Sequence, residues 1–166
     1  TQFTGSIAEG GAVYFRKVFI NPHGNGTHTE CFGHISEDWQ SINQHLRQFV
    51  FGCVLVSVAP KAQDADQVVE LDQLQAALAA YHPTQATAIA IRTLPNSPAK
   101  QQRQYRNTNP PYVHADGLRW LYDWGIRHLL IDTPSVDREW DDGVLAAHHA
   151  FWNYPAAPHT DATITE

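Results

Sequence analysis

The chain has 166 residues, of which 43% are hydrophobic and 17% are charged. This length and apolar content predict one domain over residues 1–166, which we expect to be incomplete at both ends. A formal charge of −6 without a basic run argues against a nucleic-acid partner. Two cysteines are too few for a disulfide scaffold or a cysteine zinc cluster. With no membrane-length apolar stretch and no signal-peptide pattern, we expect a cytoplasmic protein with no membrane partner.

The first third of the chain predicts strands separated by a turn-rich loop. Weakly alternating apolar residues over 5–20 predict one or two strands, broken by adjacent glycines. Residues 21–26 are rich in Asn, Pro and Gly and favour a loop, and residues 27–35 are compatible with an extended segment. The run over 49–58 is almost continuous in β-branched and aromatic residues, which predicts a strand buried on both faces.

The rest of the chain alternates helical and strand-like patterns. Helices are expected over 66–80, 116–124 and 141–152, and strands over 87–92, 128–131 and 162–166. The long polar connection over 94–111 is typical of a functional, disordered or interface segment. Strands that alternate with helices indicate the α/β class, with a mixed β-sheet and flanking helices.

Ten histidines distinguish this chain from an ordinary α/β domain, and the first of them form a cluster. His23, His28 and His34 lie within twelve positions, with Glu30 among them. If this stretch is extended, positions 28, 30 and 34 share one face. Two imidazoles and a carboxylate on one surface suit a divalent metal such as zinc or manganese. The alternative is a set of surface polar residues beside a turn.

A second histidine pair, His148 and His149, lies on the last expected helix. Adjacent helical residues point about 100° apart, so we expect only one of the two to face a given site. His148 shares a stripe with Val144 and Phe151. The alternative is that one imidazole packs in the core with a hydrogen-bond partner while the other meets solvent.

Several segments in the same order resemble the cyclase family of metal-dependent hydrolases, which includes bacterial kynurenine formamidases and isatin hydrolases. Residues 26–34 resemble the family motif His-x-Gly-Thr-His-x-Asp-x-Pro-x-His, and residues 125–137 and 147–152 match two later segments. The closing ATITE resembles the strand that carries a late glutamate. The resemblance implies a swivelling β/β/α fold, a homodimer or homotetramer, and one or two zinc or manganese ions.

The resemblance also implies roles for individual residues. It assigns metal ligation to His28, Glu30, His148 and Glu166 and proton transfer to His34, with His23 and His149 as further ligand candidates. The first histidine of the motif falls on Gly24, one residue after His23, and Glu30 stands where the motif has aspartate.

The function that this resemblance implies is hydrolysis of a small amide or lactam by a metal-activated water. An arylformamidase with a substrate such as N-formylkynurenine is the specific expectation. Phe32 and Trp152 are expected to line its pocket, although such aromatics also build ordinary cores.

Two other functions are compatible with the same residues. One is a non-catalytic member of the family that binds a small molecule with an altered metal site. The other makes Cys31 a nucleophile with His34 as its base, although alternation along a strand would place these two side chains on opposite faces.

Overall fold

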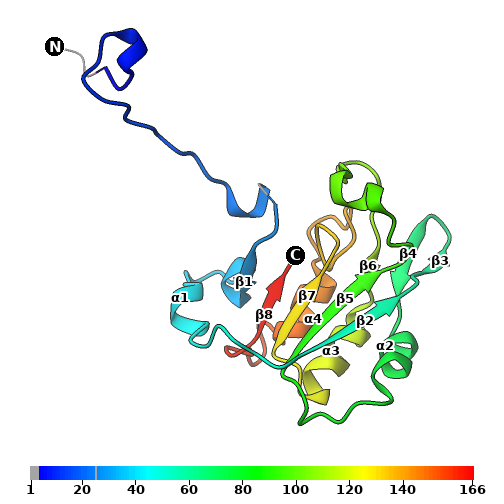
Figure 1. Cartoon of the computed structure of the whole chain (residues 1–166). Coiled ribbons are helices and arrows are strands. Elements are labelled where there is room, and N and C mark those ends of the chain that lie inside the picture. The colour runs from blue at the N-terminus through cyan, green and yellow to red at the C-terminus, as the bar shows by residue number, and fades with distance from the viewer. Residues whose placement is uncertain (1–3, 25) are drawn as a thin grey trace.

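In the computed structural model, which describes residues 4–24 and 26–166, a five-stranded sheet carries the molecule (Figure 1). Its strands are β1 (Thr29–Cys31), β2 (Cys53–Val58), β5 (Ala88–Thr93), β7 (His128–Ile131) and β8 (Thr163–Thr165). They lie in the order β1-β8-β7-β5-β2, and all neighbours are parallel except β1, which is antiparallel to β8. The mixed sheet of an α/β fold is therefore confirmed.

A smaller sheet corrects the helix expected over 66–80. This second sheet has the order β3-β4-β6, with β3 (Lys61–Gln63), β4 (Asp66–Val69) and β6 (Tyr112–Val113). Val68 and Val69 pair with β6 and are fully buried, so their tertiary partners outweigh helical periodicity. Helix α2 (Leu71–Leu78) begins only after Glu70, which forms a capping box with Gln73.

The remaining helices are short. They are α1 (Ile42–His45), α3 (Ala115–Trp124) and α4 (Ala146–Trp152), and 3-10 turns occur at Ile7–Glu9, Pro22–Gly24, Phe32–His34 and Pro98–Gln102. Helix α3 contacts both α2 and α4. Helix α4 starts five residues later than expected because Asp142, Gly143 and Leu145 have positive φ angles, which a right-handed helix excludes. Within the described residues, no helix is both long and apolar enough to cross a bilayer.

The strands expected over 5–20 are wrong. Residues 4–24 contain no strand, and the part before the 3-10 turn Pro22–Gly24 extends away from the sheets as an arm (Figure 1). Val18, Phe19 and Ile20 are at least 73% exposed there. An alternating pattern predicts a strand only where another strand pairs with it, and no strand of the described residues pairs with this segment.

Strand β2 also differs from the expectation, because it is buried on one face rather than two. Val54, Val56 and Val58 point into the core, whereas Leu55 on the opposite face is 58% exposed. Helix α2 contacts this edge strand. The apolar run therefore predicted the strand correctly, but the prediction that both of its faces are buried is wrong.

The pairing of β1 with β8 brings candidate site residues from distant parts of the chain together. Glu30 lies opposite Ile164 in this pairing. Just beyond it, His28 and Glu166 exchange two backbone hydrogen bonds of 3.0 and 3.1 Å. Residues from the two ends of the sequence therefore share one edge of the sheet.

Candidate metal centre

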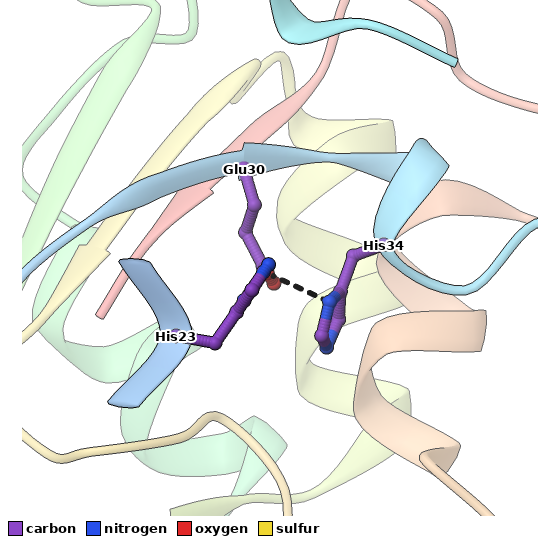
Figure 2. A group of neighbouring side chains, drawn as sticks. All are labelled: His23, Glu30 and His34. Carbon is purple, nitrogen blue, oxygen red and sulfur yellow. Dashed lines mark ion pairs between the residues drawn. The ribbon is translucent and has the colours of Figure 1, made fainter. Parts of the chain in front are cut away.

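The Glu30 carboxylate is the centre of the histidine cluster. It descends from β1 and is only 5% exposed. Its Oε2 lies 3.2 Å from His23 Nδ1, 3.6 Å from His28 Nε2 and 3.3 Å from His34 Nδ1. Figure 2 shows the His23 and His34 rings converging on this carboxylate. Three imidazole nitrogens thus surround one carboxylate oxygen.

The histidines reach Glu30 by a different route from the one expected. Strand β1 ends at Cys31, so His34 does not share its face; the 3-10 turn Phe32–His34 brings the ring back instead. His23 lies on another 3-10 turn rather than on a strand, so its one-residue shift from the motif does not reverse its direction. Asn25, within the loop between His23 and His28, lies outside the described residues.

Two buried atoms of the cluster have no hydrogen-bond partner among the described residues: Glu30 Oε2 and His28 Nε2. Nδ1 of His28 lies 3.1 Å from the Gly26 carbonyl oxygen, and a hydrogen bond there requires the proton on Nδ1. In the neutral form of the ring, Nε2 then presents a lone pair toward a carboxylate oxygen. Two buried acceptors that face each other are costly, and a cation between them satisfies both. The residues therefore fit a metal ion.

Glu166 adds a second carboxylate beside His28. Its Oε2 accepts a 2.8 Å hydrogen bond from the Val136 backbone. Burial raises the pKa of Glu166 to about 7, and the opposing charge of His148 does not offset it. The cluster offers two groups of three ligand atoms, His23–Glu30–His34 and His28–Glu30–Glu166. Because Glu30 belongs to both groups, it is placed to bridge two ions.

His148 approaches Glu30 from the other side, but it belongs to neither ligand group. Nε2 lies 3.0 Å from Glu30 Oε1, and Nδ1 lies 2.5 Å from Asp137 Oδ2. Burial lowers the pKa of His148, but the hydrogen bonds to these two carboxylates outweigh it and raise the pKa to about 9. An imidazolium has no lone pair for a metal. In the metal-free chain His148 therefore orients Glu30, and its expected role as a ligand stays a prediction.

Asp137 is a further site residue, which the sequence marked only by its position after a buried strand and not as a partner of His148. It is 7% exposed and accepts hydrogen bonds from the backbone of Ala147 at 2.7 Å and of His148 at 3.1 Å. It therefore caps α4 and fixes the imidazole on that helix. The only available signal was its place after strand β7, where α/β proteins put site residues.

Two other candidate site residues, His149 and Cys31, do not take part in the cluster around Glu30. The Nδ1 atom of His149 is 2.8 Å from the Tyr154 carbonyl oxygen, so this ring is committed to the local turn. Cys31 is 3% exposed, and burial raises the pKa of its thiol. A buried thiol that resists ionisation is a poor nucleophile, so the structure gives no support to the cysteine hypothesis.

Phe32 and Trp152 lie in the hydrophobic core rather than in a pocket wall. They are 6% and 0% exposed, and neither lines the cavity of about 490 Å³ that adjoins His28 and Glu166. The Trp152 ring packs 5.3 Å from the His148 ring, and its Nε1 donates to the Ala162 carbonyl at 3.1 Å. Trp152 therefore packs against His148 in the core and does not line the pocket, which corrects its expected role.

Trp152→Phe is expected to lower the free energy of unfolding by about 1–3 kcal/mol, because the buried Ala162 carbonyl loses its donor. Urea denaturation measures this change. Trp39→Phe is the matched control, because Trp39 is 82% exposed and should change stability by less than about 0.5 kcal/mol. Unchanged stability with a changed affinity for a small molecule would restore Trp152 to the pocket.

The buried charges also predict how stability depends on pH in the metal-stripped chain. The pKa of Glu166 is raised from 4.5 to about 7, so the contribution of Glu166 to the free energy of unfolding falls as pH rises from about 4.5 through 7. The pKa of His148 is raised to about 9, so its share is complete below about 6.5 and falls as pH rises through 9. Each contributes on the order of 3 kcal/mol.

Above pH 6.5, where the histidines with lowered pKa values are neutral in both states, we therefore expect the free energy of unfolding of the metal-stripped chain to decrease up to pH 9, measured by urea denaturation with a chelator present. His148→Gln should flatten the part above pH 6.5. Added zinc should stabilise the chain more at pH 8 than at pH 5, because deprotonated ligands bind it better. A profile that rises over this range would contradict the assigned charges.

Comparisons with known proteins place this site in context. A family model described as "Putative cyclase" matches residues 2–138, which is more than half of the chain. A solved structure named "The Structure Of Potential Metal-Dependent Hydrolase With Cyclase Activity" is 17% identical with a TM-score of 0.64. A predicted metal-dependent hydrolase from Bacillus stearothermophilus is 18% identical with a TM-score of 0.58.

The alignment with each structure covers 90% of this chain. The chain spans 64% and 63% of the lengths of those two proteins, respectively. At these identities the likeness shows a shared fold. No protein of curated function matches the chain.

Proposed function

Because the chain belongs to the cyclase family, as its motifs predicted, we propose that it is a metal-dependent hydrolase of small amides or lactams. The observation that carries this proposal is a pair of buried atoms that have no hydrogen-bond partner among the described residues, Glu30 Oε2 and His28 Nε2. With Glu166 and His23 nearby, they supply the mixed nitrogen and oxygen ligands that suit zinc or manganese. A bound divalent cation would acidify a water molecule and polarise the substrate carbonyl.

His34 is the residue that we propose for proton transfer. Burial lowers the pKa of His34, and the neighbouring Glu30 carboxylate only partly opposes this effect. A neutral imidazole at pH 7 is able to take a proton from the attacking water and return it to the leaving amine. His34→Gln should therefore abolish turnover and retain an ion in the His28–Glu30–Glu166 group, to which His34 does not belong. Loss of that ion as well would show that His34 acts as a ligand rather than in proton transfer.

The specific substrates that we propose first are aryl formamides. Similarity of the histidine motif to that of the kynurenine formamidases supports this choice. The cavity beside His28 and Glu166 has a volume of about 490 Å³, within the usual range for small-molecule sites of roughly 300–1,000 Å³. The Tyr105 ring contributes an aromatic surface to its wall.

Metal content and formate release test the proposal together. Chain purified without added metal is analysed by elemental mass spectrometry and then assayed with N-formyl aryl amines. We expect bound zinc or manganese and measurable hydrolysis, both lost in His28→Ala and both kept in His82→Ala, whose exposed histidine pairs only with its own turn. A chain that binds no metal after soaking in zinc and manganese would favour the non-catalytic binding protein.

A further inference from the structure

We infer that Arg103 binds a carboxylate on the substrate, so that the site selects amides that carry an anionic group. This inference rests on the proposed function, because it concerns the same cavity. It starts from the composition of the cavity wall. The wall includes His28 and Glu166 of the cluster and also Lys100, Arg103 and Tyr105 from the long polar connection. One ligand in this cavity would therefore be able to reach both the metal centre and these cations.

The first of these cations, Lys100, is fully committed to the fold. Its Nζ donates to the Thr93 carbonyl at 2.8 Å, to Thr93 Oγ1 at 2.6 Å and to Asp132 Oδ2 at 2.6 Å. An ammonium has three donors, and all three are used. Lys100 thus ties the 3-10 turn Pro98–Gln102 to the carboxyl ends of β5 and β7, and Asp132 neutralises its charge.

Arg103 directly follows that turn and keeps its charge available. Within residues 4–24 and 26–166, no hydrogen bond or ion pair engages its guanidinium, and its Cζ lies 5.2 Å from the centroid of the Tyr105 ring. Other arginines of the fold are committed: Arg127 pairs with Asp161, and Arg138 with Asp66. A guanidinium stacked on an aromatic ring keeps its edge free for a planar anion.

The chemistry of this wall favours a carboxylate over a neutral group. A guanidinium donates two parallel hydrogen bonds to a carboxylate, which suits its fork geometry. The Lys100–Asp132 pair is internally neutral, so it does not compete with Arg103 for an anion. A metal at the cluster would offset the charges of Glu30 and Glu166, which removes their repulsion of the same ligand.

The test compares two substrates that differ only in this charge, 2-formamidobenzoate and its methyl ester, with zinc-loaded protein and formate release as the readout. Arg103→Gln should lower kcat/KM for the acid by roughly tenfold and for the ester by less than twofold, because only the acid loses a charge-assisted hydrogen bond. Arg103→Lys should retain part of the preference. Arg16→Gln is the matched control, since Arg16 stacks on Tyr14 at 5.0 Å in the N-terminal arm.

An equal loss for the acid and the ester, or no loss for either, would overturn the inference. If the zinc-loaded chain hydrolyses neither compound, calorimetric binding of both decides the question separately. Tenfold weaker binding of the acid to Arg103→Gln would keep the carboxylate site while the proposed hydrolysis fails. Binding of the acid that is indifferent to Arg103→Gln would reject the carboxylate site by itself.

Discussion

Glu30→Gln is expected to remove the bound metal while leaving the chain folded. Glu30 belongs to both ligand groups, so its replacement weakens every ion that the cluster can hold. Loss of an outer partner alone costs roughly tenfold to a hundredfold in metal affinity, and loss of a shared ligand should cost more than a hundredfold. The amide oxygen still accepts the hydrogen bond from His148 Nε2, so the core contact survives. Elemental analysis and zinc titration measure the change.

The control for this substitution is Glu37→Gln, which makes the same carboxylate-to-amide change at an exposed position. It should bind metal like the unmodified chain. Urea denaturation of metal-stripped Glu30→Gln establishes that the variant is folded. Full metal content in folded Glu30→Gln would show that the cluster is not the metal centre, and the proposed function would fail with it.

Asp137→Asn is expected to have the largest effect on stability. An amide at this position can still accept from the Ala147 backbone, but it removes the negative charge next to the His148 imidazolium. Breaking a buried ion pair by removing one partner costs about 3–5 kcal/mol, because the other charge stays buried. The variant should also bind metal more weakly, since Glu30 loses the imidazole that orients it.

Urea denaturation and zinc titration of the same preparation test both parts of this prediction. Asp161→Asn is the matched control: Asp161 pairs with Arg127, but its side chain is 60% exposed, so the loss should stay below about 1 kcal/mol. A loss for Asp137→Asn as small as that of the control would mean that His148 is neutral and not held by this carboxylate.

Much of the central sheet was predictable because its strands are locally encoded. The apolar runs around Val54, Ile89 and Leu129 mark β2, β5 and β7 without reference to their neighbours. The predictions of secondary structure are wrong where pairing with a distant strand determines whether a segment is a strand. Val68 and Val69 follow a helical period yet join a sheet, and the residues over 5–20 alternate yet pair with no strand of the described chain.

The spacing of residues along the chain was also enough to predict part of the candidate site. His28, Glu30 and His34 lie within seven positions, and any compact path of this segment keeps their side chains near one another. The turn that positions His34, however, follows from the end of β1 at Cys31, which spacing along a strand does not indicate. The closeness of these residues was predictable, and the path between them was not.

The amino-acid order therefore determined strands β2, β5 and β7, the first histidine cluster and the family, because each depends on residues close together in the chain. Tertiary structure decided the rest. His148 meets Glu30 across 118 positions, and Glu166 reaches His28 only because β8 pairs with β1. No periodicity relates such distant residues. Burial then sets their charges, because each acquires its partners and loses water only once the sheet and α4 have packed together.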